Sequence, residues 1–309
     1  MLLNDCLRFV NIRERTLFKQ LIRFEDDIMA GECRRRRTEM QALGMCRIVV
    51  EDGKVTEVGE PRLKYCPLFN KLLGIEEIDS ETVRKNLEYR VKSFGFGTEE
   101  RVVRAGDYVT FGVSEILSTA VKDGRLDGAV IAADGCGSAV LTDPELIQGL
   151  CGRISGMVST DPLDTVLDAV GRNRVVDPDT TPVDQVRGAE LAMRLGLKRF
   201  AVTVCRPEDS ETIRRMCSDR AVIIAVHTSC VSEEGAQKFY ANCDFLTACA
   251  SRVIREIAYS RPDVIIAGNK IPIIAVTDIG KELVLSKLKE LGKEPWDRKE
   301  PTVDPKPWL

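Results

Sequence analysis

The stretch Phe200-Ala201-Val202-Thr203-Val204-Cys205 decides the fold class. It is a continuous apolar run of strand length, which is typical of a strand buried on both faces of a parallel sheet. Similar runs cover residues 129–136, 221–227 and 244–249, and helical patterns alternate with such runs. This alternation predicts an α/β fold with a mostly parallel sheet and helices on both faces.

Two further pairs of apolar runs predict antiparallel pairing. Residues 264–267 and 273–276 are joined by a segment too short for a helical crossover, so we expect an antiparallel strand pair near the C-terminus. Upstream, an Asp-Gly pair at 52–53 separates two β-rich runs and predicts a hairpin. Helices are expected to open at Ser80, as N-cap, and at residues 160–162.

These patterns divide the chain into four segments. Residues 1–40 are expected to form a helical or mobile appendage that folding does not require, because their apolar periodicity is weak. The other expected segments are an N-terminal α+β part at 41–125, an α/β domain at 126–292 and an extended, proline-rich tail at 293–309.

The composition limits the classes of function. Of 309 residues, 44% are hydrophobic and 30% are charged, which indicates a folded globular protein. The net charge of −3 gives no general attraction to nucleic acid or to an anionic membrane, although Arg34–Arg37 is either a solvated stretch or a local binding patch. No apolar run reaches the about 18–20 residues that span a bilayer, and the first residues lack signal-peptide order, so we expect a cytoplasmic protein.

The chain's only histidine and four of its cysteines lie where the expected strands stop. These residues are His227, Cys136, Cys205, Cys230 and Cys249. Parallel strands share one carboxyl edge, where open α/β sheets bind ligands, so we expect His227, Cys249 and Asp134 on one rim. A histidine there can act as acid, base or ligand, or can be a hydrogen-bonded structural residue.

Glycine-rich turns offer candidate anion sites. In Asp134-Gly135-Cys136-Gly137-Ser138, the glycines let backbone N–H groups approach a phosphate or carboxylate, although a plain tight turn explains them as well. Arg153 and Ser155 lie in a second glycine cluster, which is either an anion-binding loop or a connector. If the protein is an enzyme that acts on a small anionic molecule, we expect His227 and Asp134 to be catalytic. Gly135, Gly137, Arg153 and Thr228 would then bind the substrate.

Eleven cysteines in a cytosolic protein favour metal binding or catalysis over disulfides, or are small buried hydrophobic residues. Cys66 stands in a Cys-Pro pair, a setting that also occurs in cluster ligation. No Cys-x-x-Cys spacing occurs in the sequence, so a metal site would have to combine ligands from distant segments.

Several ordered blocks resemble the methanogenesis marker protein 8 family over residues of about 40 to 292. The blocks are Lys64–Phe69, Phe111–Leu117, Thr142–Leu146, Gly152–Gly156, Ala225–Thr228 and Thr247–Ser251. The resemblance implies a methanogenic archaeon, an anaerobic cytosol and a task linked to methane metabolism. It places Cys66, His227, Thr228 and Cys249 inside matched blocks. At Cys136, Cys205 and Cys230 the family also has other small residues.

Three hypotheses follow. The first is an accessory protein in assembly, activation or modification of methyl-coenzyme M reductase or of a methanogenic cofactor. Its partner would be that reductase or its maturation machinery, and Cys66, Cys249 and His227 would hold an iron–sulfur cluster or zinc. The second is a metal-free α/β enzyme acting on a small phosphorylated or carboxylated molecule. The third is a non-catalytic module that docks a partner at the sheet edge.

Overall fold

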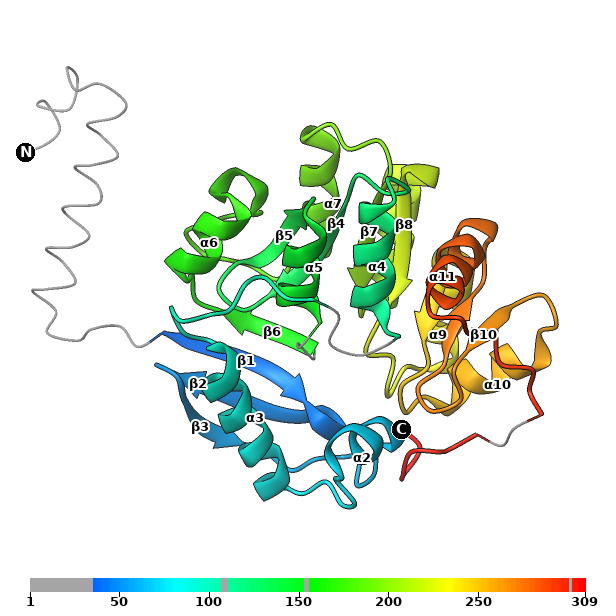
Figure 1. Ribbon diagram of the computed structural model, residues 1–309, viewed down its shortest axis with the longest axis horizontal. Helices are drawn as coiled ribbons and strands as arrows, with labels where there is room; N and C mark the ends of the chain where they lie inside the picture. The colour runs from blue at the N-terminus through cyan, green and yellow to red at the C-terminus, as the bar shows by residue number, and fades with distance from the viewer. Residues whose placement is uncertain (1–35, 107–110, 153–155, 300–301) are drawn as a thin grey trace, which may run out of the picture. The chain divides into compact units, whose positions relative to one another are not determined.

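The structure is a computed structural model and describes residues 36–106, 111–152, 156–299 and 302–309. Arg36–Leu309 forms one compact unit. The described residues of this unit build a seven-stranded sheet between helices and a four-stranded sheet beside it (Figure 1). The α/β class predicted from the alternation of apolar runs and helices is confirmed.

The larger sheet has the strand order β10-β11-β9-β8-β7-β4-β5. Its centre, β4, β7, β8 and β9, is parallel. The strands β5, β11 and β10 are antiparallel to their neighbours, so the sheet is mixed and the expected mostly parallel sheet describes only its centre. The expected antiparallel pair near the C-terminus is confirmed as β10 and β11. The strands are β4 (Gly128–Ala133), β5 (Gly137–Leu141), β7 (Phe200–Val204), β8 (Ala221–Ala225), β9 (Phe245–Thr247), β10 (Ile265–Ala267) and β11 (Ile273–Ala275).

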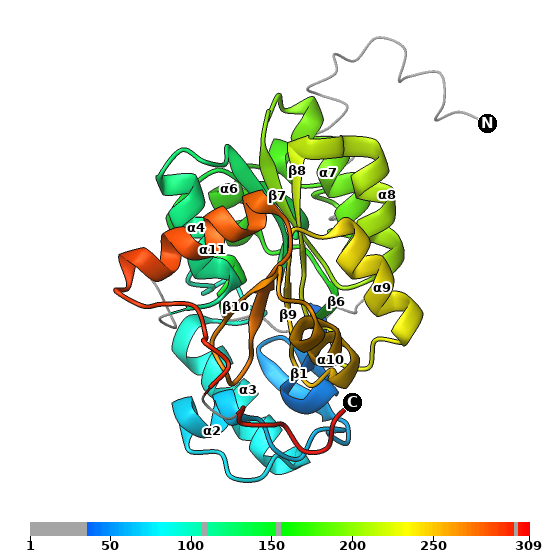
Figure 2. The ribbon, with the colours of Figure 1, turned by 90° about the vertical axis from the view of Figure 1, so that its right-hand side faces the viewer.

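Helices cover both faces of this sheet, as expected. Figure 2 shows α4 and α11 on one side and α8 and α9 on the other. The first face packs on α4 (Val113–Lys122), α5 (Pro144–Cys151), α6 (Asp164–Val170) and α11 (Asp278–Glu290). The second face packs on α7 (Gln185–Arg194), α8 (Pro207–Cys217), α9 (Glu233–Asn242) and α10 (Arg252–Ser260). Because both faces are covered, the central strands are apolar throughout, which is the pattern seen in the sequence.

Helix starts follow their capping residues. The side chains of Asp143, Asp184 and Ser232 accept hydrogen bonds from backbone N–H groups in the first turns of α5, α7 and α9. Two expected starts are corrected. Asp79, not Ser80, caps α3 (Ser80–Phe94), since its carboxylate accepts from the Thr82 N–H. Residues 160–162 do not open a helix, because Thr160 ends a strand and α6 begins at Asp164.

The smaller sheet has the order β3-β2-β1-β6 and carries α2 (Pro67–Leu73) and α3. The predicted hairpin is confirmed as β2 (Cys46–Glu51) and β3 (Lys54–Val58). β1 (Arg37–Ala42) pairs with β2 on one side and with β6 (Gly156–Thr160) on the other. The boundary expected at residue 40 therefore falls inside a strand, and the α/β part supplies one strand of the smaller sheet.

The described part of the proline-rich tail is mostly extended, and residues at its two ends pack against the cores beside the two sheets. Trp296 packs against the second face of the larger sheet, and Lys306 pairs with Tyr65 beside α2. The Leu309 N–H donates to the Ala250 carbonyl oxygen at 2.9 Å. Within the described ranges, none of the helices has the length and apolarity that crossing a bilayer requires.

Candidate functional site

Four candidate residues lie together at one edge of the larger sheet. Asp134, Cys205, His227 and Cys249 follow the last residues of β4, β7, β8 and β9. These strands are parallel neighbours, so their carboxyl ends share one rim. The smaller sheet's segments cover the rim at β4, through Gly97 and Arg101, and at β9, where Cys66 and Ala250 share one apolar core.

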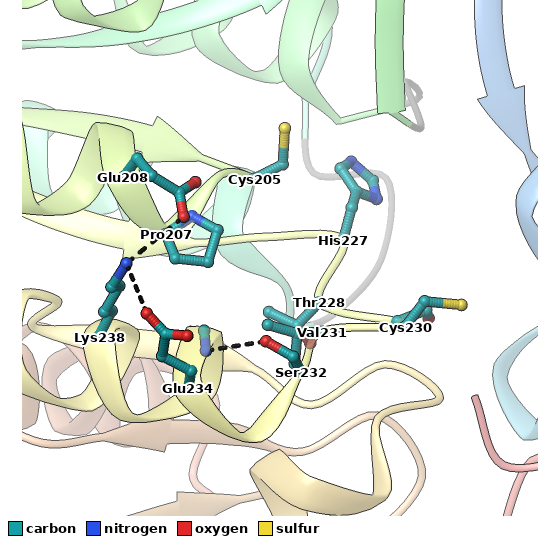
Figure 3. Close-up of a pocket in the computed structure, with 12 residues that line it drawn as sticks. Cys205, Pro207, Glu208, His227, Thr228, Cys230, Val231, Ser232, Glu234 and Lys238 are labelled. Atoms are coloured by element: carbon teal, nitrogen blue, oxygen red, sulfur yellow. Dashed lines mark hydrogen bonds and ion pairs between the residues drawn. The ribbon is translucent and has the colours of Figure 1, made fainter.

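A cavity of about 360 Å³, here called the histidine cavity, opens at the ends of β7 and β8. Figure 3 shows the side chains of Cys205 and His227 extending in the same direction, whereas the Cys230 sulfur points away from them. The cavity is lined by Cys205, Pro207, Glu208, His227, Thr228, Ser229, Cys230, Val231, Ser232, Glu234, Gly235 and Lys238.

His227 is the residue of this cavity best suited to chemistry. Its side chain is exposed, and its ring makes no hydrogen bond with the described residues. The protein that surrounds the recess desolvates the ring and lowers the pKa of His227 to about 4. The imidazole is therefore neutral near pH 7, with a ring nitrogen free to accept a proton or a hydrogen bond.

The backbone around His227 is unusual. His227 and Cys230 have φ angles of +54° and +63°, a region that residues other than glycine seldom adopt. Such backbone is held in place by its surroundings and clusters at functional sites. Here Thr228 donates to the Thr247 carbonyl oxygen at 2.6 Å, and the Cys230 sulfur lies 3.4 Å from the Met45 sulfur. Both contacts fix the loop that carries His227.

Most other polar groups in the cavity already have partners. Lys238 forms ion pairs with Glu234 at 3.1 Å and with Glu208 at 3.7 Å. Ser232 caps α9, and Ser229 accepts from the Ala250 N–H at 3.1 Å. Cys205 is exposed at the cavity, and desolvation by the surrounding protein raises the pKa of its thiol. At neutral pH the cavity therefore presents a neutral imidazole and a protonated thiol.

Asp134, which we expected to act with His227, does not line the histidine cavity. Its side chain is fully buried, and the Arg101 guanidinium donates to it at 3.0 Å through Nε. The Gly97 N–H also donates to Asp134, at 2.8 Å. Arg101 donates further to the Val102 and Gly149 carbonyl oxygens. This carboxylate lies at the predicted rim but anchors residues 97–101 to the end of β4.

The expected anion cradle is also corrected. A Cβ atom on Gly135 would lie 2.7 Å from Leu163, and one on Gly137 would overlap the Thr181 carbonyl oxygen. The chain's own backbone and side chains therefore fill the space in which a phosphate would have to sit. Cys136 between these glycines is fully buried, and desolvation raises its pKa to about 12. Arg153 and Ser155 lie outside the described residues.

The expected metal ligands are only partly brought together. Burial raises the pKa of the Cys66 thiol, and repulsion from Cys249 raises it further, so these two thiols lie within electrostatic range. Over the described ranges, however, no three His, Cys, Asp or Glu side chains form a group that could hold a metal ion. Cys66, Cys249 and His227 therefore do not form a three-ligand centre here. All nine described cysteines are free thiols.

Some lining residues were not predicted from the sequence. Glu208 and Lys238 lie on helices that follow β7 and β8. Helices after parallel strands begin at the ligand-binding edge, and this rule could have drawn attention to Glu208 in the first turn of α8. Lys238 lies beyond the first turn of α9 and has no comparable signal.

Comparisons with known proteins agree on one family. Residues 39–289 match the family described as "Uncharacterized protein conserved in archaea (DUF2099)". An uncharacterized protein of Methanocaldococcus jannaschii, MJ0054, is 41% identical over 260 residues, which are 83% of this chain and 92% of that protein. No solved structure matches the chain. On the extent of these matches, the chain belongs to the DUF2099 family of proteins conserved in archaea.

Proposed function

We propose that the histidine cavity binds a small phosphorylated or carboxylated molecule and that His227 accepts a proton from it. The observation that carries this proposal is the exposed, neutral imidazole of His227, which has no hydrogen-bond partner among the described residues. It stands at the carboxyl edge of parallel strands, where α/β proteins bind ligands. Deprotonating the substrate would convert the imidazole to imidazolium, which a nearby anionic group of the substrate stabilises.

His227 provides an unusually direct test because it is the chain's only histidine. Its imidazole gives one pair of carbon-bound proton signals in an NMR spectrum of protein purified without a histidine tag. We screen phosphorylated and carboxylated metabolites by thermal shift and then follow these signals for each stabilising compound. A substrate should move the His227 signals and should be turned over by the wild type. His227→Gln should bind the substrate and lose the turnover.

The control is Arg194→Gln, which alters an exposed residue at the end of α7 that does not line the histidine cavity. It should keep turnover. If every stabilising compound leaves the His227 signals unmoved, the histidine cavity is not the ligand site. If His227→Gln retains full turnover, His227 is not the proton acceptor.

At the level of the cell, we propose a cytoplasmic accessory role in methanogenesis. The resemblance to the methanogenesis marker protein 8 family supports this role, and a relative occurs in Methanocaldococcus jannaschii. The protein would act in assembly, activation or modification of methyl-coenzyme M reductase or of a methanogenic cofactor. Replacing the gene in a methanogen with the His227→Gln form should lower methyl-coenzyme M reductase activity in extracts, while Arg194→Gln should not. Equal activity in both strains would contradict the role.

The same extracts test the iron–sulfur or zinc hypothesis. Protein isolated without oxygen is analysed for iron, zinc and sulfide, together with Cys66→Ser and Cys249→Ser. If the wild type contains a metal that both variants lose, Cys66 and Cys249 bind it together with ligands that the described residues do not group with them. This result would favour the metal-binding accessory protein over a metal-free enzyme.

A further inference from the structure

A second cavity adjoins the histidine cavity and has a different electrostatic character. It measures about 370 Å³ and is here called the arginine cavity. Arg62, Arg252 and Trp308 line it, and Cys230 and Val231 line both cavities. The loop that carries His227 therefore has one cavity on the imidazole side and the other beyond Cys230.

The two arginines of this cavity form no ion pair with the described residues, and the anionic group that lines the cavity with them is the α-carboxylate of Leu309. Both side chains are exposed, and neither forms a hydrogen bond or an ion pair with the described residues. No Asp or Glu is among the described residues that line the cavity. By contrast, Lys238 in the histidine cavity is paired with two glutamates. The two guanidinium groups outnumber the single carboxylate in this recess, and arginine binds an oxyanion through two parallel hydrogen bonds.

The wall of the arginine cavity is built from buried structure. The guanidinium of Arg255 lies 4.8 Å from the centre of the Trp308 ring, and the Arg255 side chain is 2% exposed. Arg255 also donates to the carbonyl oxygens of Ala248 and Cys249, at the end of β9. Arg255 also forms an ion pair with Asp304 at 3.5 Å, so its charge is compensated and its role is to hold the Trp308 ring in the cavity wall.

We propose that Arg62 and Arg252 bind the phosphate or carboxylate group of the molecule whose other end reaches His227. This inference rests on the proposed function of the histidine cavity and names the residues that hold the substrate's charge. It replaces the glycine turn at 135–137, which the protein itself fills. The substrate class is then a small molecule with an acidic group at one end and an acidic proton at the other.

The probe for the experiment is inorganic phosphate, titrated against chloride at constant ionic strength and followed by calorimetry. The wild type should bind phosphate saturably. Arg62→Gln and Arg252→Gln should each raise the Kd at least tenfold, and the double variant should lose saturable binding. The control is Arg194→Gln, which removes an exposed charge at the end of α7, on the opposite edge of the sheet, and should leave the Kd unchanged. Binding that is equal in all variants, or absent in the wild type, overturns the inference.

A second measurement uses the wild-type protein alone, so it does not require that the arginine variants fold. Phenylglyoxal modifies exposed arginines, and mass spectrometry locates the modified sites. Phosphate should slow modification of Arg62 and Arg252 at least tenfold and should leave Arg194 unaffected. Equal rates with and without phosphate overturn the inference.

His227→Gln separates the two proposals. It should bind phosphate with the wild-type Kd, because its substitution leaves both arginines in place. If this variant turns over substrate normally while the arginine variants lose phosphate, the role of His227 fails and the arginine cavity stands. If the arginine variants bind phosphate normally while His227→Gln loses turnover, the proposal for the arginine cavity fails and the role of His227 stands.

Discussion

The Asp134 carboxylate and the Arg101 guanidinium form an ion pair of 3.0 Å in which both side chains are fully buried. The pair joins the end of β4, in the larger sheet, to the segment after α3, the helix that packs on the smaller sheet. Removing one partner would leave an uncompensated buried charge, which is far more costly than the loss of a surface pair.

Asp134→Asn should therefore lower the free energy of unfolding by about 3–5 kcal/mol, measured by urea denaturation. The control is Asp143→Asn, because the Arg104–Asp143 pair is partly exposed and asparagine still caps α5. That variant should lose less than about 1 kcal/mol. Equal stability of the wild type and Asp134→Asn would show that the pair does not hold the two parts together.

The single histidine should titrate abnormally in an NMR experiment. The folded protein should show a pKa of about 4 for His227, against about 6.5 in the unfolded chain. Between these values the unfolded chain binds a proton that the folded protein does not bind. The free energy of unfolding should therefore fall as the pH drops through this window, and His227→Gln should lack this contribution. A folded-state pKa above 6 would contradict the desolvation described for the cavity.

Truncation should distinguish the two possible beginnings of the fold. A chain that starts at Met40 lacks Arg37–Glu39, which pair with both β2 and β6. Losing about five ladder pairs should cost roughly 3–5 kcal/mol and lower the Tm by about 6–15 °C. A chain that starts at Arg36 retains the whole compact unit and should melt within a few degrees of the full chain. Equal melting of both truncated chains would show that the first half of β1 is dispensable.

Alanine substitutions at two glycines should distinguish the cost of backbone strain from the cost of steric overlap. Gly137 and Gly196 have φ angles of +59° and +83°. A Cβ atom meets nothing within 4 Å at Gly196, so Gly196→Ala should cost about 1 kcal/mol for the left-handed backbone alone. At Gly137 it overlaps the Thr181 backbone, so Gly137→Ala should cost about 2–4 kcal/mol in a denaturation experiment. If both variants lose the same free energy of unfolding, the backbone at residues 181–182 can shift to accommodate a methyl group at position 137.

Much of the fold could be predicted because its signals are local. Continuous apolar runs located β4, β7, β8 and β9, and the Asp-Gly pair at 52–53 located the hairpin of β2 and β3. β1 was missed, because its sequence Arg-Thr-Glu-Met-Gln-Ala mixes charges with apolar residues. Its alternation of buried and exposed residues depends on long-range contacts, because Met40 packs into the core and β1 pairs with β6, a strand distant in the sequence.

The candidate site was predictable in position and not in detail. The rule that ligands bind at the carboxyl ends of parallel strands placed His227 correctly at the sheet edge. It could not show that Asp134 is neutralised, because Arg101 lies in another segment with no motif to connect them. Likewise, no motif connects Arg62 and Arg252, which line one cavity because distant segments pack beside Trp308.

The pairing of β1 with β6 has a consequence for synthesis on the ribosome. The hydroxyl groups of Thr38 and Thr160 lie 3.1 Å apart, although 122 positions separate them in the sequence. At about 5–20 residues per second, β1 waits roughly 6–24 s for its second neighbour to be made. During that interval one edge of β1 has unpaired N–H and C=O groups that can recruit another nascent chain. Slow translation between β3 and β6 would therefore increase aggregation, and a chaperone that covers this edge would reduce it.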